Sequence, residues 1–277
     1  MPQTTILIAT SMKRTNWLIK RSLYSVYKQE NVNPELINIL IVDDNENEEE
    51  FFIIKTKINN LRRKLNLSTH YFSTDIIRNK GVKFNSGTGA WNTGIKHTYT
   101  LNKDGFISIL DDDDEYLPNH LSACLSEIKD DTLAVFQSLE WRNQDNTIIS
   151  FPLSLKKLTP LNFFLGNPGV QGSNMFFKTK CLIVINGFDE SLPNTTDRDL
   201  MIRFLENIKS LDTISVIKEV GVLHYNHNKK KVNNNLPLKQ KGLDLFYAKY
   251  KNQFSEFDFQ NSLIRANKYF NYEYSKA

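Results

Sequence analysis

The sequence predicts an α/β fold in which a mostly parallel central sheet is flanked by helices. Three observations lead to this prediction. Short β-branched apolar segments alternate with segments of helical apolar spacing up to about Pro118. The chain has 277 residues and 40% hydrophobic residues, enough for one large domain with a sizeable core. Acidic residues directly follow two of the apolar segments, where ligands bind in open parallel sheets.

The first part of the chain supplies the alternation. The predicted strands are short apolar runs: TTILIAT (4–10), LINILIVDD (36–44), THYFST (69–74) and GFISIL (105–110). The predicted helices between them are NWLIKRSLYSVYKQ (16–29), FFIIKTKINNLRRKL (51–65) and GTGAWNTGIKHTYT (87–100). Because the carboxyl ends of parallel strands meet at one edge of a sheet, we expect Asp43, Asp44 and the aspartates 111–114 to share one crevice.

After Pro118 the pattern changes. A helix is predicted at 119–128, strands at 132–142 and 146–152, and a pair of strands within 213–226. From about residue 236 the chain is aromatic and basic and reads as a helical appendage. Its aromatic side chains either pack on the core or form a surface for a partner or a membrane.

Charge and cysteine content limit the functional classes. The net charge of +4 suits an anionic substrate or a membrane surface but does not indicate nucleic-acid binding. The two cysteines predict a reducing compartment, hence the cytoplasm. No apolar run is long enough to cross a bilayer, and the first residues lack the basic stretch of a secretory signal. We therefore expect at most a peripheral contact with the inner face of a membrane, through the C-terminal segment.

The stretch ISILDDDDEYLP (107–118) places four aspartates and a glutamate directly after a buried strand. Adjacent carboxylates repel one another, so we expect a cation to offset their charge. A solvated acidic loop rarely starts at the end of a buried strand. An EF-hand loop needs a glycine at its sixth position, where Tyr116 stands when Asp111 is counted first. A Mg²⁺ or Mn²⁺ site completed by substrate phosphates explains why the carboxylates cluster at a strand end, and a solvated acidic loop is the alternative.

Five segments, in the right order, resemble family-two glycosyltransferases of the GT-A fold. ILDDDDEYLP resembles the metal-binding D-x-D element of that family. The other four are ILIATSMKR with the helix that follows it, ILIVDDNENEE, NKGVKFNSGTGAWNTGIKHT and INGFDESLPNTTDRDLMIRFL. The resemblance covers about residues 5–227. It implies a GT-A domain at 1–235, with a nucleotide-binding half to about 118 and an acceptor half from 119, and an appendage at 236–277.

The resemblance also implies roles for individual residues. Asp43 and Asp44 would contact the base and ribose of a nucleotide sugar, and Asp111 would reach the ribose. By the same resemblance, Asp113 would be the main metal ligand. On an extended segment residues 111 and 113 face the same way, so we expect these two side chains to lie together. Asp197 would be the catalytic base. The remaining residues expected to bind the nucleotide sugar are Thr10, Arg14, Asn92, Asp112, Gln171 and Gly172.

Some assignments beside these are less direct. His224, rather than His227, is expected to complete the metal shell. Asp114 is expected to point away and to cap the helix that starts near Pro118. Asp199 would orient its helix or contact the acceptor, and Arg203 would pair with a nearby acid. The sequence departs from the family pattern at Thr196, where an acid is usual, and at Trp91, where arginine is common.

The implied reaction explains these residue types. A divalent cation, Mn²⁺ or Mg²⁺, stabilises the charge of the departing diphosphate, and a carboxylate takes the proton of the acceptor hydroxyl. One base without an enzymic nucleophile implies inversion at the sugar carbon. The expected donor is a UDP-sugar, and the acceptor is a glycan, a lipid-linked glycan or a peptide. A nucleotidyltransferase and a non-catalytic nucleotide- or carbohydrate-binding protein of the same fold are the alternatives; TSMKR lacks the glycine that a triphosphate loop usually needs.

Overall fold

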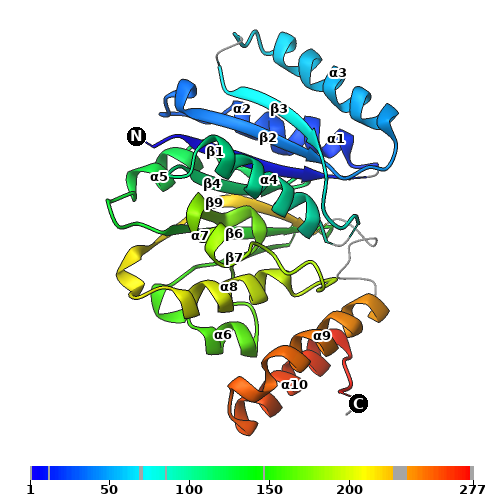
Figure 1. Cartoon of the computed structure of the whole chain (residues 1–277), viewed down its shortest axis with the longest axis vertical. Coiled ribbons are helices and arrows are strands. Elements are labelled where there is room, and N and C mark those ends of the chain that lie inside the picture. The colour runs from blue at the N-terminus through cyan, green and yellow to red at the C-terminus, as the bar shows by residue number, and fades with distance from the viewer. Residues whose placement is uncertain are drawn as a thin grey trace.

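The fold is built around one central sheet (Figure 1). The computed structural model describes residues 2–11, 13–68, 71–84, 86–145, 147–226 and 236–274. Within these residues the sheet has nine strands in the order β3-β2-β1-β4-β8-β6-β9-β5, with β7 paired to β6. The strands are β1 (Thr4–Thr10), β2 (Ile37–Asp43), β3 (Ser73–Arg78), β4 (Phe106–Asp111), β5 (Glu115–Tyr116), β6 (Ala134–Asn143), β7 (Ile148–Phe151), β8 (Met175–Lys178) and β9 (Ile214–Asn226).

The first four strands are parallel, as predicted, and β6 and β9 are also parallel. The pairings of β8 with β4 and β6, of β7 with β6 and of β5 with β9 are antiparallel. The longer helices are α3 (Glu48–Lys64), α4 (Thr88–Leu101), α8 (Thr196–Asn207), α9 (Leu236–Tyr250) and α10 (Glu256–Phe270). The shorter ones are α1 (Thr15–Trp17), α2 (Leu23–Tyr27), α5 (His120–Ser126), α6 (Pro160–Leu165) and α7 (Thr179–Val184). Single turns are η1 (Leu18–Ser22), η2 (Pro34–Leu36), η3 (Leu155–Lys157), η4 (Gly172–Asn174), η5 (Leu211–Thr213) and η7 (Lys251–Gln253).

The continuous apolar strands bury both faces of the sheet. In β1, Leu7 packs in the cluster that contains α4, α7 and α8, whereas Ile6 and Ile8 pack in the cluster that contains α2 and α3. This follows from the alternation of side chains along a strand. The two helical layers hold the sheet rigid, so that the carboxyl ends of β1, β2 and β4 stay side by side.

Three local predictions were wrong. The expected helix 16–29 is interrupted by the π-helical turn η1. The third strand was expected at 69–74: Thr69 and His70 lie outside the described residues, and the strand begins at Ser73, because Arg62 binds the carbonyl oxygens of Tyr71 and Phe72 just before it. The predicted final strand pair is the single strand β9, whose register against β6 shifts at Ser138.

The C-terminal helices α9 and α10 pack on the rest of the chain. Phe246, Tyr247 and Phe259 are buried in the same cluster as strand residues. These aromatic side chains therefore pack on the core, the first of the two alternatives that the sequence left open. The division of domains at 235 and 236 stays a prediction. Among the described residues, no helix has the length and apolar character needed to cross a membrane.

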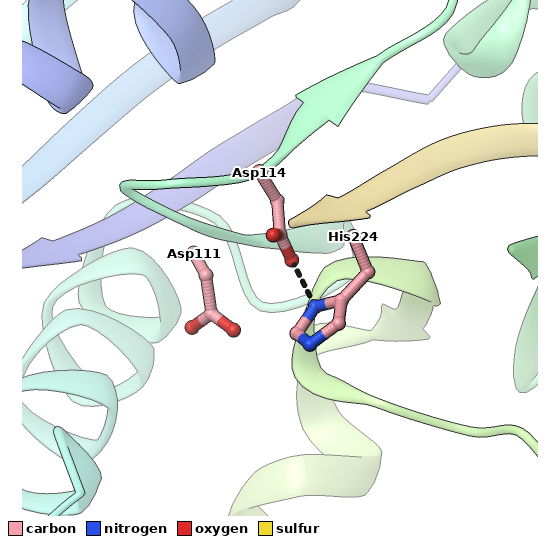
Figure 2. Close-up of side chains that lie close together, drawn as sticks. All are labelled: Asp111, Asp114 and His224. Carbon is pink, nitrogen blue, oxygen red and sulfur yellow. Dashed lines mark hydrogen bonds and ion pairs between the residues drawn. The ribbon is translucent and has the colours of Figure 1, made fainter. Parts of the chain in front are cut away.

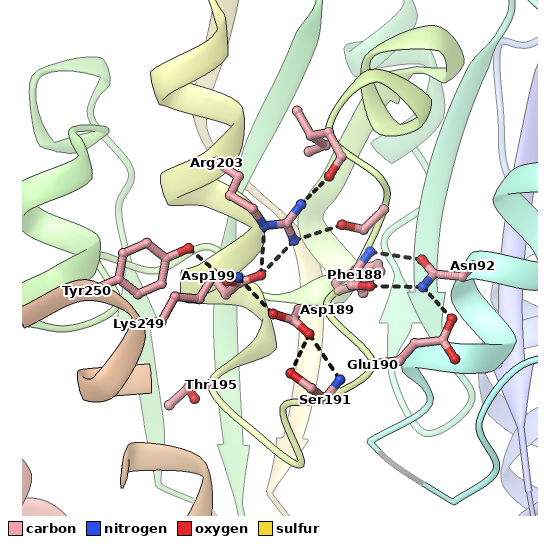
Figure 3. A network of polar contacts seen from close by, with 12 residues as sticks. Asn92, Phe188, Asp189, Glu190, Ser191, Thr195, Asp199, Arg203, Lys249 and Tyr250 are labelled. Carbon is pink, nitrogen blue, oxygen red and sulfur yellow. Dashed lines mark hydrogen bonds and ion pairs between the residues drawn. The ribbon is translucent and has the colours of Figure 1, made fainter. Parts of the chain in front are cut away.

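A buried ionic network joins α9 to α8 (Figure 3). The carboxylate of Asp199 accepts hydrogen bonds from Arg203 at 2.6 and 2.9 Å, from Lys249 at 2.6 Å and from the Tyr250 hydroxyl at 2.7 Å. Lys249 also reaches Asp189 at 2.7 Å. Asp199 therefore orients its helix, and the predicted pairing of Arg203 with an acid is confirmed.

We expect Asp199→Asn to lower the free energy of unfolding by about 1–3 kcal/mol, because Arg203 and Lys249, both partly exposed, lose a fully buried carboxylate partner. Urea denaturation followed by circular dichroism measures this change. Asp104→Asn, at an exposed loop carboxylate, is the matched control and should stay within about 0.5 kcal/mol. Equal destabilisation by the two substitutions would mean that the network does not anchor α9.

Candidate active site

The carboxyl ends of β1, β2 and β4 meet at one small cavity, as predicted. The backbone N–H of Asp44 donates to the carbonyl oxygen of Thr10 at 2.8 Å, and Ala9 lies opposite Asp111. The cavity has a volume of about 180 Å³. Its lining residues are Ala9, Thr10, Ser11, Arg14, Asp44, Phe84, Ser86, Gly87, Trp91, Asp111 and Asp112.

The N-terminus of α4 forms one wall of this cavity. Gly87 precedes the helix with φ +76°, a conformation that side chains other than glycine rarely adopt. A Cβ at this position would also lie 3.1 Å from the indole nitrogen of Trp91. The glycine therefore lets the chain turn into α4 with Trp91 against the cavity.

The four aspartates do not form the extended segment that the sequence suggested. The backbone N–H of Asp114 donates to the carbonyl oxygen of Asp111 at 3.2 Å, and the chain turns at residues 112 and 113. The turn separates the carboxylates into two pairs. Asp112 and Asp113 face Arg14, whereas Asp111 and Asp114 face His224. The expectation that residues 111 and 113 point the same way was therefore wrong.

Asp111, Asp114 and His224 gather their ligand atoms within 4.8 Å of one another (Figure 2). The Nδ1 atom of His224 lies 2.8 Å from Oδ2 of Asp114, and the backbone N–H of Tyr225 donates to Oδ1 at 3.1 Å. Asp114 thus binds β9, not the helix near Pro118: α5 is preceded by Asn119 without a side-chain cap. His227 lies outside the described residues.

Ser173 connects the two carboxylates of this cluster. Its hydroxyl donates to Oδ2 of Asp114 at 2.5 Å and accepts from the backbone N–H of Asp111 at 3.0 Å. Gly172, beside it, lies against Asp111: a Cβ there would be 3.8 Å from the carboxylate. Burial and the charges of Asp114 and Asp113 raise the pKa of Asp111 to about 6, although His224 and Arg14 oppose the shift. The negative charge of Asp111 is thus less favourable here than in water.

The other two aspartates both contact Arg14. Its guanidinium contacts Oδ1 of Asp112 at 2.6 Å and Oδ1 of Asp113 at 2.8 Å. Thr10 donates to Asp112 at 2.7 Å. Burial works against the charge of Arg14, but the two acids outweigh it and raise the pKa of the guanidinium. Asp113 therefore has a protein cation as partner, and its assignment as main metal ligand stays a prediction that this geometry does not favour.

Arg21 and Tyr225 brace the turn from outside. Arg21, on η1, donates to the carbonyl oxygen of Asp113 at 2.8 Å, and its guanidinium lies 3.8 Å from the centre of the Tyr225 ring. The Tyr225 hydroxyl donates to Glu115 at 3.0 Å. The π-helical turn occurs at this contact, as is frequent near functional sites. Sequence reasoning missed Arg21, Tyr225 and Ser173, because their roles depend on contacts between distant segments.

Asp197 lies in the first turn of α8, half-buried. No hydrogen bond or ion pair holds its carboxylate within the described part of the chain. Burial and the charge of Asp111 raise its pKa to about 7, while His224 and Lys239 act in the opposite direction. A carboxylate with this pKa accepts protons well near neutral pH.

The predicted base-binding residues lie at the end of β2. Asp44 accepts from Asn79 at 2.5 Å and from the backbone N–H of Phe84 at 2.9 Å. Asp43 accepts from the side chain and backbone of Asn45 through Oδ1. Its buried Oδ2 has no hydrogen-bond donor among the described residues and lies 3.5 Å from Arg78. Burial raises the pKa of both carboxyls, although the hydrogen bonds from Asn45 and Asn79 oppose the shift.

Asn92 and Gln171 have structural contacts. The Asn92 amide donates to the carbonyl oxygen of Phe188 and to Glu190, at 2.9 and 2.8 Å, and its oxygen accepts from the backbone N–H of Phe188. This amide lines two other surface cavities rather than the one at the strand ends. The backbone N–H of Gln171 donates to Asn174 and starts the turn η4 that carries Ser173.

The model of one protein family, "Glycosyl transferase family 2", matches residues 8–186, which include the turn of aspartates. The chain belongs to glycosyl transferase family 2. This membership confirms the resemblance seen in the sequence and places the chain among glycosyltransferases rather than nucleotidyltransferases. No curated protein matches the chain.

Solved structures of glycosyltransferases share the fold of this family member. TarS of S. aureus has a TM-score of 0.61 and 14% identity, over 98% of this chain and 44% of that chain. Its 1–349 form with UDP has a TM-score of 0.59 and 15% identity, over 98% of this chain and 72% of that chain. The mannosyltransferase PcManGT of Pyrobaculum calidifontis, solved with GDP-Man and Mn²⁺, has a TM-score of 0.60 and 14% identity, over 96% of this chain and 75% of that chain. The predicted GT-A fold is confirmed, and the chain spans less than half of full-length TarS.

Proposed function

We propose that this protein transfers a sugar, with inversion, from a nucleoside diphosphate sugar to an acceptor hydroxyl. The observation that carries the proposal is Asp197, a carboxylate without a hydrogen bond or ion pair among the described residues, whose pKa is raised by burial and by the charge of Asp111 and lowered by that of His224. A proton acceptor beside a cation-binding cluster is what displacement of a diphosphate requires. We assign the role of base to Asp197 and the role of nucleophile to no carboxylate, and we therefore propose single displacement.

The metal ligands in this proposal are Asp111, Asp114 and His224. Two carboxylates and an imidazole suit Mn²⁺ well, and Mg²⁺ less well because it prefers oxygen ligands. Such an ion would supply the positive charge that stabilises the departing diphosphate. Ser173 and the backbone of Tyr225 hold Asp114 in place, and Arg14 keeps Asp112 and Asp113 away from the cluster.

The donor in this proposal is a UDP-sugar. Asp44 lines the cavity at the strand ends, and Oδ2 of the preceding residue, Asp43, has no hydrogen-bond donor among the described residues. In this proposal that oxygen accepts an N–H of a nucleobase. UDP and UDP-GlcNAc are bound in the TarS structures, whereas GDP-Man is bound in PcManGT. Uracil and guanine both present such an N–H, so a GDP-sugar is the alternative donor. Measuring the binding of both nucleotide sugars decides between them.

The acceptor in this proposal is a glycan, a lipid-linked glycan or a peptide, reached in the cytoplasm. Helix α10 exposes Phe257, Ile264 and Tyr269, with Lys268 beside them. Apolar and basic side chains together bind anionic membrane surfaces, so we include peripheral membrane contact through α10. Co-sedimentation with vesicles of anionic and of neutral lipid tests this membrane contact. If the protein binds neither kind of vesicle, the proposed membrane contact is refuted.

A panel of nucleotide sugars tests the function. We expect one donor to raise the melting temperature in the presence of Mn²⁺, since ligands of the native state stabilise it by mass action. That donor should also be hydrolysed slowly without acceptor, and EDTA should abolish the hydrolysis. Stabilisation without hydrolysis or transfer would identify a non-catalytic binding protein, and hydrolysis unaffected by EDTA would remove the metal from the proposal.

The pH dependence follows from Asp197. Because its pKa is raised to about 7, the carboxylate is largely protonated below pH 6 and cannot accept the hydroxyl proton. We expect the rate of transfer to rise with pH, with a midpoint near 7. Initial rates at saturating donor and Mn²⁺ between pH 5 and 9 measure the midpoint. A midpoint near 4, the ordinary pKa of an aspartate, would contradict the raised pKa of Asp197 on which this prediction depends.

A further inference from the structure

The C-terminal helix α9 reaches the residues that precede Asp197. The Asn194 amide donates to the carbonyl oxygen of Leu238 at 2.6 Å, and Thr195 donates to that of Gly242 at 3.5 Å. Gly242 approaches the Asn194 side chain so closely that any Cβ would overlap it. Thr195 itself has φ +60°, which is uncommon for a β-branched residue. Helix α9 therefore fixes the backbone from which the candidate base projects.

Lys239 lies in the first turn of α9, next to these contacts. Its side chain is only 6% exposed, and its ammonium lies 4.3 Å from the centre of the Phe270 ring. Among the described residues, no carboxylate and no hydrogen-bond acceptor contacts this ammonium. Buried lysines are normally paired, and a cation at a helix N-terminus is further disfavoured by the helix dipole. The position therefore lacks an anion.

The surroundings of Lys239 are cationic. Burial and the charges of Arg198 on α8 and Arg265 on α10 lower its pKa to about 7, and Asp197 is the one acid that opposes this shift. Arg198 is engaged elsewhere, because it donates to the carbonyl oxygens of Phe163 and Phe164 at the end of α6. Lys239 is thus a buried cation without an acid bound to it among the described residues, on the side of Asp197 where α9 packs.

We propose that Lys239 binds an anionic group, a phosphate or a carboxylate, that the acceptor carries beside the hydroxyl reacting at Asp197. The inference rests on the proposed function, because it takes Asp197 as the base. It narrows the acceptor to a molecule with a negative charge near its nucleophilic hydroxyl. A bound anion would supply the counter-charge that the ammonium lacks and would hold the hydroxyl against Asp197.

Small anions test the proposal without an identified acceptor. Dimethyl phosphate and acetate are the two probes, trimethyl phosphate is the neutral control, and NMR titration at constant ionic strength gives their dissociation constants. We expect Lys239→Met to weaken binding of the preferred anion about tenfold or more, and Lys239→Arg to retain it. Lys241→Met, at an exposed lysine of the same helix, is the matched control and should bind as the wild type does. Preference for dimethyl phosphate indicates a phosphate-bearing acceptor, and preference for acetate a carboxylate-bearing one.

Equal affinity of Lys239→Met and the wild type would overturn the proposal, as would the absence of anion binding in the wild type. If Lys239→Met does not fold, ¹⁵N NMR of lysine-labelled wild-type protein decides: the preferred anion should raise the pKa of Lys239, and no change overturns the proposal. The proposed function and the role of Lys239 can be refuted independently. Absence of donor hydrolysis removes the proposed function while anion binding is still measured, and unchanged anion binding with active hydrolysis removes only the role of Lys239.

Discussion

Replacing Asp197 by asparagine is expected to lower the rate of sugar transfer by about 10²–10⁴-fold, the usual contribution of a general base. Asparagine keeps the size of the side chain but cannot take the hydroxyl proton. Binding of the donor should change little, because no hydrogen bond or ion pair among the described residues joins Asp197 to the strand ends at which we propose that the nucleotide binds. Single-turnover rates at saturating donor, together with donor affinity by calorimetry, separate the two effects.

Glu206→Gln is the matched control for this substitution. Glu206 is an exposed acid at the other end of α8 and should tolerate the change with nearly normal turnover. Normal turnover of Asp197→Asn would remove it as the base. Loss of donor affinity equal to the loss of rate would instead make Asp197 a binding residue.

The second large effect concerns the metal. We expect Asp114→Asn to weaken binding of Mn²⁺ in the presence of UDP by about 10–100-fold or more, because it removes a ligand and releases His224. Asp113→Asn is the informative comparison: it is the neighbouring residue, and its carboxylate faces Arg14. We expect its Mn²⁺ affinity to fall by no more than about threefold. A larger loss in Asp113→Asn than in Asp114→Asn would restore the ligand assignment made from the sequence.

Much of the fold could be predicted because its signals are local. The apolar runs of β1, β2 and β4 and the acids that follow them lie within a few residues of one another. Parallel strands then bring Asp43, Asp44 and Asp111 to one edge without further information. The predicted position of β3 failed because contacts from Arg62, on another element, decide where the strand begins.

The division of labour among the four aspartates could not be predicted for a similar reason. A run of identical residues carries no signal of which carboxylate faces which cation. The turn at residues 112 and 113 is held by Arg14 and Arg21, and Asp114 is oriented by Ser173 and β9, all far away in sequence. Lys239 gave no sequence signal either, because a lysine near a helix start is usually exposed.

The central claim is that Asp111, Asp114 and His224 bind the metal that accompanies the donor. Pulsed electron paramagnetic resonance of Mn²⁺ with UDP and [¹⁵N]histidine-labelled protein tests it most directly. We predict ¹⁵N coupling to Mn²⁺ in the wild type and its loss in His224→Gln. Absence of the coupling in the wild type, or its persistence in His224→Gln, would contradict the claim.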